Sequence, residues 1–523
     1  NIWLGTWNKG VNKFDIKPQK FRTLVHDPAN DDSISMNIIR DIQHDRENNL
    51  WIATLNGLDL FDFKKNRFFH FRHDGQIPGT ISSNHVTELY LDRQDQLWVG
   101  TREGLNKYDP IGGQFQVHMY SDSDPSSLSS NNIQRLIDDH QTPDRYLWVA
   151  TRDRGLNRMD KLSGQCIRFL HDSGDPNSIS HNKVYNLYNQ ENGTFWVGTW
   201  AGLCRYNRDK QNFRRIRSTI ENGDKMDHER ITSLAGDPSQ YPSIIWIGTW
   251  GGGLLRYDIR TNRFKRYSSQ DGLATPLISG IIIEPNGYLW ISTPSGISRF
   301  NTVTQRALNY TVSIGEQYNA FNAGAYHKVP NGRIYFGGLY GLTYFKPSDM
   351  INNPFPPETV LTSFKVFDQP KSFKAFSENG KKIALNYSDN FFSIEFAGLE
   401  FTNPRKNRYA YLLEGVDKGW RYTDAKNRTV TYMNIDAGTY PFHIKAANSD
   451  GNWSKTKTLL TIQMVPPYWD TIYFKVFGIL LLIALTLMLF KLRVRRIESD
   501  NLKLHRLVDE QTHDLRQSKQ ELE

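Results

Sequence analysis

The sequence predicts a mainly β chain with a seven-bladed β-propeller, an immunoglobulin-like β-sandwich, one transmembrane helix and the start of a coiled coil, in that order. Three observations predict this arrangement. A tryptophan motif recurs every 44 to 50 residues, short alternating apolar runs follow it, and an uncharged segment of 15 residues lies near the C-terminus. A chain of 523 residues has room for several such domains.

The repeated motif has the pattern apolar–Trp–apolar–small–Thr. Its tryptophans are Trp3, Trp51, Trp98, Trp148, Trp196, Trp246 and Trp290, and Tyr335 takes that place in a degenerate eighth copy. Each repeat holds four runs of β-branched and aromatic residues between Gly, Asn or Asp turns, which is typical of strands. Four strands in about 47 residues is the period of a propeller blade, so each tryptophan is expected in the core between blades.

The ring is expected to close with seven blades. The first unit starts at its second strand, and the last unit lacks a fourth strand before Pro347. Residues 21–25 form a spare fourth strand, and pairing them with residues 342–345 would remove the open edges. Residues 17–350 are then the propeller, and residues 1–16 are a remnant of a preceding propeller. Eight blades is the alternative, and we expect the chain to be a fragment of a longer polypeptide.

The repeat disappears after the propeller. Residues 355–467 instead carry short alternating runs at 360–366, 391–396, 409–413, 430–433, 440–446 and 459–465, with turn signals at Asn379-Gly380, Asp436-Ala437-Gly438 and Asp450-Gly451-Asn452. About seven short strands over this length predict an immunoglobulin-like sandwich.

Residues 472–490 are expected to span a membrane. At ~1.5 Å per residue they extend roughly 28 Å, close to the hydrocarbon thickness of a bilayer, and Lys475 can extend to the interface. Aromatic residues precede the segment, and four cations follow it: Lys491, Arg493, Arg495 and Arg496. The positive-inside rule then predicts a single pass with residues 1–470 periplasmic or extracellular and residues 491–523 cytoplasmic.

The cytoplasmic segment 491–523 shows a heptad pattern. Its apolar a and d positions are Ile497, Leu504, Val508, Leu515 and Leu522. Such a pattern is typical of a two-stranded coiled coil. We therefore expect a homodimer that forms through this segment and through the sandwich.

Composition and motifs exclude several functions. The net charge of +9 is modest and comes without a block of five like charges, so contact with nucleic acid is not expected. A Walker loop, a His-Glu-x-x-His motif and a CxxC pair are all missing from the sequence. Cys166 and Cys204 occupy different repeat positions, so a disulfide between them is not expected. The sequence therefore predicts no catalytic residue, metal ligand or cofactor site.

A binding site can be predicted from the blade geometry. In a four-stranded meander, the residue after each motif Thr shares a face with the long loops that join the blades. Exposed aromatic rings there can stack on sugar rings, and Arg can bind hydroxyls or a uronic carboxylate. The candidate ligand-binding residues are Arg102, Arg152, Trp200, Trp250 and Tyr340. The alternative is that both tryptophans pack on neighbouring blades or on the missing propeller. The recurring Ser-x-Asn segments are expected to be turn caps.

Two parts of the chain resemble known families. The motif Asn48-Asn49-Leu50-Trp51-Ile52-Ala53-Thr54 and its copies resemble the two-component regulator propeller repeat. The segment Tyr411-Leu412-Leu413-Glu414-Gly415, with Trp420, Tyr432, Gly438-Thr439-Tyr440, Trp453 and Pro466-Pro467-Tyr468-Trp469, is similar to the Y_Y_Y domain. The resemblance implies a bacterial sensor of the one-component or hybrid two-component type in the inner membrane. Such sensors commonly detect carbohydrate breakdown products in the periplasm and usually carry two propellers.

The type of output domain that would receive the signal is not determined by these residues. Residues 508–515 resemble the linker before a histidine kinase core, but the same linker precedes diguanylate cyclases. His513-Asp514 lacks the pattern that surrounds a phosphoacceptor His. The sequence therefore predicts the sensory ectodomain and membrane span of a signal-transduction receptor, with a histidine kinase as its expected output and an oligosaccharide or other periplasmic small molecule as its ligand. The alternatives are a diguanylate cyclase output, a membrane-anchored propeller enzyme or lectin, and a passive scaffold.

Overall fold

The computed structural model describes residues 2–7, 10–14, 20–217, 229–238, 242–314, 317–350, 353–371, 382–401 and 403–520. The chain divides into two compact units. One is Lys17–Ile351, and the other combines Asn1–Ile16 with Asn352–Glu523.

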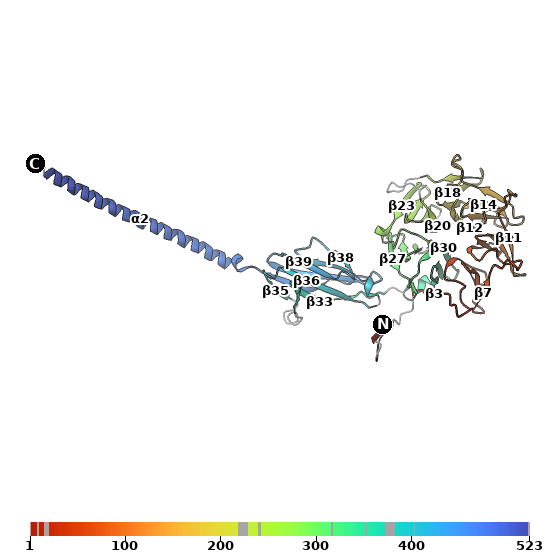
Figure 1. The fold of residues 1–523 in the computed structure, drawn as a ribbon, viewed down its shortest axis with the longest axis horizontal. Coiled ribbons are helices and arrows are strands. Elements are labelled where there is room, and N and C mark those ends of the chain that lie inside the picture. The colour runs from red at the N-terminus through yellow and green to blue at the C-terminus, as the bar shows by residue number, and fades with distance from the viewer. Residues whose placement is uncertain are drawn as a thin grey trace. The chain divides into compact units, whose positions relative to one another are not determined.

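The first unit is a β-propeller. Within the described residues it contains seven four-stranded antiparallel sheets arranged around a central axis (Figure 1). Six blades use consecutive strands: β4 (Ile39–His44), β5 (Leu50–Thr54), β6 (Gly57–Asp62) and β7 (Arg67–Phe71); β8 (Val86–Leu91), β9 (Leu97–Thr101), β10 (Gly104–Asp109) and β11 (Gln114–His118); β12 (Ile133–Asp138), β13 (Tyr146–Thr151), β14 (Leu156–Asp160) and β15 (Cys166–Phe169); β16 (Val184–Asn189), β17 (Phe195–Thr199), β18 (Gly202–Asn207) and β19 (Asn212–Arg215); β20 (Ile231–Gly236), β21 (Ile244–Thr249), β22 (Leu254–Asp258) and β23 (Arg263–Tyr267); β24 (Gly280–Ile283), β25 (Tyr288–Thr293), β26 (Gly296–Asn301) and β27 (Arg306–Tyr310).

The seventh blade closes the ring with strands from both ends of the unit. Its first three strands are β30 (Phe321–Lys328), β31 (Ile334–Gly338) and β32 (Gly341–Phe345), and its outer strand is β3 (Arg22–Leu24). Thr23 pairs with Thr343, and their hydroxyl oxygens lie 3.2 Å apart. The predicted closure by the spare strand is therefore confirmed, and the ring has seven blades rather than eight.

The motif tryptophans form the contacts between blades, as predicted. Trp98, Trp148, Trp196, Trp246 and Trp290 are at most 1% exposed. Trp196, for example, packs with Ile231 and Tyr257 of the following blade. Several of these indoles also donate to a polar side chain at the preceding turn, as Trp246 does to Asp237 at 3.2 Å. The ring therefore packs against the next blade, while the hydrogen bond holds the indole within its own blade.

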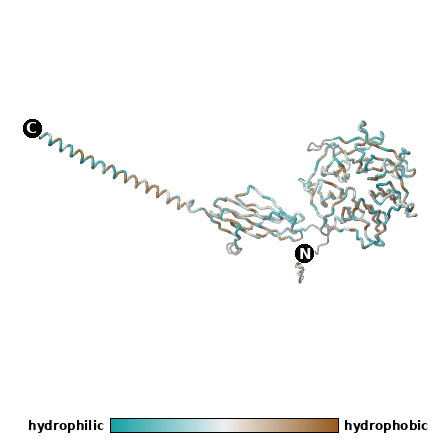
Figure 2. The backbone as a smooth tube through the Cα atoms, in the orientation of Figure 1, coloured by the Kyte–Doolittle hydropathy of each residue, from teal (hydrophilic) through white to brown (hydrophobic). Residues whose placement is uncertain are grey.

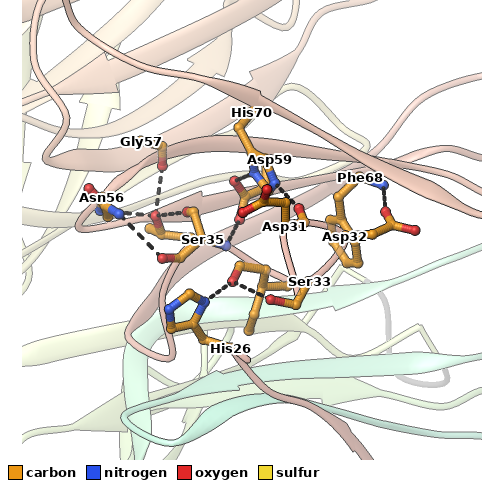
Figure 3. Close-up of polar contacts among 12 residues, drawn as sticks. His26, Asp31, Asp32, Ser33, Ser35, Asn56, Gly57, Asp59, Phe68 and His70 are labelled. Carbon is orange, nitrogen blue, oxygen red and sulfur yellow. Dashed lines mark hydrogen bonds and ion pairs between the residues drawn. The ribbon is translucent and has the colours of Figure 1, made fainter. Parts of the chain in front are cut away.

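The Ser-x-Asn segments are structural caps at the blade junctions, also as predicted. Ser35 donates its N–H to the Asp59 carboxylate at 2.7 Å, and its hydroxyl lies 2.9 Å from that of Thr54 (Figure 3). Thr54 in turn donates to the Gly57 carbonyl. The same arrangement recurs at Ser82, which contacts Asn106 and Thr101. These polar side chains are therefore engaged in holding the loops.

Residues before the propeller form a two-stranded antiparallel sheet of β1 (Ile2–Thr6) and β2 (Gly10–Phe14). Its motif residue Trp3 is 55% exposed, unlike the buried tryptophans of the ring. Residues 1, 8–9 and 15–16 of the predicted remnant lie outside the described residues.

The sandwich packs two sheets around one core. In the described residues, one sheet has the order β34-β33-β36-β39 and the other β35-β41-β40-β37-β38. The strands are β33 (Glu358–Val366), β34 (Gln369–Pro370), β35 (Lys382–Asn386), β36 (Phe391–Leu399), β37 (Arg408–Leu413), β38 (Arg421–Asp424), β39 (Thr429–Met433), β40 (Gly438–Ala447) and β41 (Lys457–Val465). The six predicted runs all fall within strands, and Phe392, Phe396 and Phe442 are buried in the shared core. The predicted turn at Asn379-Gly380 lies outside the described residues.

The last element is a single helix, α2 (Ile472–Gln520), of 49 residues. It is long and apolar enough to cross a membrane, and its apolar first half stands out in Figure 2. The predicted membrane segment and the heptad segment thus lie in one continuous helix. The ammonium of Lys475 pairs with Asp470 at 2.7 Å, which gives this cation a partner just before the apolar run.

Short elements complete the structure. They are the hairpin of β28 (Ser313–Ile314) and β29 (Gln317–Tyr318) and the 3-10 turns η2 (Ser269–Asp271), η3 (Pro347–Asp349), η4 (Pro404–Lys406) and η5 (Tyr468–Asp470).

Candidate functional site

A bulge in the innermost strand shapes one end of the propeller channel. In five blades the pairing of the first two strands skips one residue, which is Arg40, Thr87, Gln134, Tyr185 or Thr232. β-Bulges bend a strand and re-aim a side chain, and they are frequent beside binding sites. In four of these blades the bulged residue follows the Asn of the Ser-x-Asn segment by three positions. In the fifth blade Thr232 follows Glu229 by the same distance. The bulges therefore lie at the end where the blade-joining loops enter.

The turn residues that follow the Trp motif lie at the same end of the channel, where a recurring backbone hydrogen bond holds them. In four blades the N–H after the motif Thr donates to the carbonyl of a residue just before the inner strand: Arg102 to His85, Arg152 to Asn132, Trp200 to Lys183 and Trp250 to Arg230, at 2.9 to 3.2 Å. In the seventh blade the N–H of Leu339, which follows Gly338, donates to Ala320 in the same way. This bond holds the turn against the inner strand. Because each bond lies within one blade, it fixes the turn residue at the channel end of its own blade.

A cavity of about 250 Å³ opens there. Its lining residues are Arg40, Gln134, Arg152, Tyr185, Trp200, Arg230, Ile231, Thr232, Trp250, Phe321, Asn322 and Ala323. Three of the five predicted site residues, Arg152, Trp200 and Trp250, are among them. Arg102 does not line the cavity but lies close enough to Arg40 to affect its ionisation. Tyr340 also lies outside the lining, and its N–H donates to Asn319.

The two tryptophans have different surroundings. Trp200 lies against Tyr185, with ring centroids 5.3 Å apart, and the Arg230 guanidinium of the next blade lies 4.5 Å from its ring. Trp200 is thus partly engaged with a neighbouring blade. Trp250 is 46% exposed although its backbone is held by Arg230 and Leu277. A flat aromatic face on a fixed backbone is therefore available at the cavity.

The cavity wall is strongly cationic on one side. Burial and the like charges of Arg152 and Arg102 lower the pKa of Arg40, and its Nε has no hydrogen-bond partner among the described residues. Burial and the same arginines lower the pKa of His85 to about 4, so this imidazole is neutral near pH 7. Within the described part of the chain, none of the three arginines forms an ion pair.

A buried ion network crosses the channel beneath this end. Arg135 lies 2.5 Å from Glu88 and 3.8 Å from Asp41, and it donates to the Gly324 carbonyl. Burial raises the pKa of Glu88 and of Asp41, although Arg135 opposes the shift. The network joins the innermost strands of four blades, β4, β8, β12 and β30, and stabilises the inner ring.

Among the described residues, no three His, Cys, Asp or Glu side chains gather closely enough to hold a metal ion. Cys166 and Cys204 are buried thiols without a disulfide. Their pKa values are raised by burial, which disfavours the reactive thiolate.

Sequence reasoning missed much of the lining. Arg40, Gln134 and Tyr185 are bulge residues, and Arg230 and Asn322 lie near the start of an inner strand. Their constant position after the Ser-x-Asn segment is a usable signal. The sequence would have revealed these lining residues only if a β-bulge had been assumed three positions after each Ser-x-Asn segment.

Comparison with known proteins agrees with this architecture. The family model described as "Two component regulator propeller" matches residues 80–103, and the model "Y_Y_Y domain" matches residues 400–464. The chain carries a two component regulator propeller and a Y_Y_Y domain. These residues fall in the second blade and in the sandwich, so the Y_Y_Y domain is the fold that follows the propeller.

Similar proteins include one named as a histidine kinase and one described as a hybrid two component system. The chain is 26% identical over 338 residues to Histidine kinase P4 of Formosa agariphila, a match that covers 62% of this chain and 24% of that protein. It is 25% identical, with a TM-score of 0.72, to the extracellular domain of a B. thetaiotaomicron protein described as a hybrid two component system, covering 89% of this chain and 60% of the other. A second such domain from B. thetaiotaomicron is 20% identical, with a TM-score of 0.48, covering 88% and 66%.

The chain thus spans about a quarter of the curated relative. Together with the candidate membrane helix α2, these similarities support a single-pass membrane receptor whose propeller and Y_Y_Y domain are extracellular.

Proposed function

We propose that this chain is the sensory and membrane-spanning part of a bacterial sensor histidine kinase that responds to a carbohydrate-derived ligand in the periplasm. The observation that carries the ligand proposal is the cavity at the channel end, where the half-exposed Trp250 stands beside Arg152, Gln134 and Asn322. The kinase output is supported by the similarity to Histidine kinase P4. In this arrangement residues 1–470 are periplasmic, residues 491–523 are cytoplasmic and α2 crosses the inner membrane.

The cavity suits a small polar ligand with a flat apolar face. A volume of about 250 Å³ lies just below the ~300–1,000 Å³ of typical ligand pockets, which favours a short oligosaccharide. One sugar ring would lie on the Trp250 indole, while the guanidinium of Arg152 and the amides of Gln134 and Asn322 bind its hydroxyls. Trp200, supported by Tyr185 and Arg230, forms the wall beside it.

The signal would pass through α2 in a homodimer. The helix continues from Ile472 to Gln520, and its predicted a and d residues Ile497, Leu504, Val508 and Leu515 are exposed and free to pair with a second copy. Leu522 lies outside the described residues. A ligand changes the output only if it binds one dimer arrangement more tightly than the other. A histidine kinase core encoded after residue 523 would support this output, and a diguanylate cyclase core would replace it.

Trp250→Ala is expected to weaken oligosaccharide binding at least about tenfold, because the stacking face is lost. The test is isothermal titration of the full chain in nanodiscs with a panel of neutral and acidic oligosaccharides. Trp453→Ala is the matched control, since Trp453 is 38% exposed but lies in the Y_Y_Y domain. Equal affinity of Trp250→Ala and the unaltered chain would reject the cavity as the site.

A further inference from the structure

Three arginines at the channel end, of which Arg40 and Arg152 are half-buried and Arg102 is exposed, differ from other arginines of the propeller in forming no ion pair among the described residues. Arg158 and Arg208 both pair with Asp139, and Arg266 pairs with Glu229, at 2.5 to 3.1 Å. In contrast, Arg40, Arg102 and Arg152 form no ion pair within the described ranges, although they lie close enough to shift the ionisation of Arg40 and His85.

Such an arrangement is unfavourable for the free protein. Like charges that crowd together at a partly desolvated site repel one another, and buried charges are normally paired or hydrogen-bonded. Guanidinium groups are well suited to bind carboxylates and sulfates through paired hydrogen bonds. Three unpaired arginines beside a cavity therefore point to an anionic group on what fills it.

The nearby carboxyl groups of Asp41, Glu103 and Asp153 form no ion pair with these arginines within the described ranges, although the Asp41 charge partly offsets the lowering of the Arg40 pKa. Asp41 is the carboxyl group closest in sequence to Arg40, but its Oδ2 accepts the Leu89 N–H at 2.8 Å and it belongs to the buried network with Arg135. His85 is neutral near pH 7. An anion that enters the cavity therefore meets the positive charges of Arg40, Arg102 and Arg152, to which Arg230, another lining residue, adds.

We propose that the ligand is an acidic saccharide whose oxyanion is held by Arg40 and Arg152, with Arg102 beside them, while a sugar ring lies on Trp250. This inference rests on the proposed function and deepens it by naming the ligand class. The shared chemistry is a saccharide oxyanion, supplied by a uronic carboxylate or by a sulfate ester. The cavity is thus divided into an anion-binding side and an aromatic side.

The test compares three probes on the full chain in nanodiscs by isothermal titration. They are a uronic-acid oligosaccharide, the neutral oligosaccharide made from it by carboxyl reduction, and that reduced oligosaccharide after addition of a sulfate ester, which makes it anionic again. At least one acidic probe is expected to bind ten or more times more tightly than the neutral one. That preference should fall as salt is raised, because exposed charges are screened.

Two arginine variants test whether the preference for an acidic probe arises at the anion-binding side of the cavity. Arg40→Gln and Arg152→Gln should each reduce this preference at least fivefold, and Arg152→Gln serves if Arg40→Gln fails to fold. Arg145→Gln is the control, because Arg145 is 64% exposed, pairs with Asp160 and lies in a turn at the opposite end of the blade. The better acidic probe identifies carboxylate or sulfate as the preferred group.

The outcomes separate the two proposals. If the neutral probe binds as tightly as both acidic ones and its binding depends on Trp250, the acidic ligand is rejected while the saccharide site stands. Binding of the acidic probes that is unaffected by both arginine variants also rejects the inference. If no saccharide binds, the proposed function fails as well.

Discussion

Lys161→Met is expected to lower the free energy of unfolding by about 3–5 kcal/mol at pH 7, the usual cost of breaking a buried ion pair from one side. The side chain of Lys161 is 4% exposed, and its ammonium lies 2.8 Å from Asp92 and 2.6 Å from Asp138. It also donates to the Pro143 carbonyl at 2.7 Å. Because Asp92 follows the inner strand of the second blade and Asp138 ends that of the third, the cation joins two blades. Methionine has a similar length but leaves two buried carboxylates without their cation.

This loss should depend on pH in a definite direction. Burial raises the pKa of Asp138 even with Lys161 present, and removing the cation should raise it further. A carboxyl group whose pKa is higher in the folded state than in the unfolded state costs stability as the pH rises through the folded value. The difference between the variant and the unaltered chain should therefore be larger at pH 7 than at pH 4.5.

The measurement is urea unfolding of both chains at the two pH values. Lys64→Met is the matched control, because Lys64 and Glu47 form a pair with side chains 72% and 70% exposed. Such exposed pairs contribute at most about 1 kcal/mol. A loss for Lys161→Met no greater than that for Lys64→Met would contradict the role assigned to the buried pair.

Trp246→Ala is expected to cost about 3–5 kcal/mol of unfolding free energy, the range observed when a large buried aromatic residue is removed. Trp246 is fully buried and packs against Phe300 of the next blade, with ring centroids 5.7 Å apart. Its indole N–H donates to Asp237. The substitution leaves a cavity at a blade junction, where neighbouring sheets cannot move together without disturbing the closed ring.

Trp250→Ala is the matched comparison, since it removes the same side chain four positions away at a 46% exposed site. It should change the unfolding free energy by less than about 1 kcal/mol. The two variants therefore separate the structural tryptophan from the proposed binding tryptophan. Similar losses in both would show that Trp250 also has a structural role.

The fold was predictable because repetition fixes it at every blade. The motif tryptophan and the turn after it recur at nearly constant spacing, and the unmatched fourth strand at residues 21–25 determined how the ring closes. The missed sandwich strands are short or at sheet edges, such as β34 and β38. Edge strands such as β38 are largely exposed, so they lack the alternation that reveals a strand.

The candidate site was only partly predictable. Arg152, Trp200 and Trp250 were found because their turn has a fixed place in each repeat, whereas Arg40 and Tyr185 reach the cavity through a register shift that a single sequence does not reveal. The network of Arg135, Glu88 and Asp41 joins residues that lie 47 to 94 positions apart. Contacts of this kind depend on the ring and not on local pattern.

The sidedness of α2 tests the receptor account most directly. The natural cysteines Cys166 and Cys204 are buried, so cysteines introduced at the exposed positions Thr304 and Ser518 can be followed with a membrane-impermeant thiol reagent. In intact spheroplasts Thr304→Cys in the propeller should be labelled, while Ser518→Cys near the end of α2 should be labelled only after the membrane is permeabilised. Labelling of Ser518→Cys in intact spheroplasts would contradict a helix that connects an outer sensor to the cytoplasm.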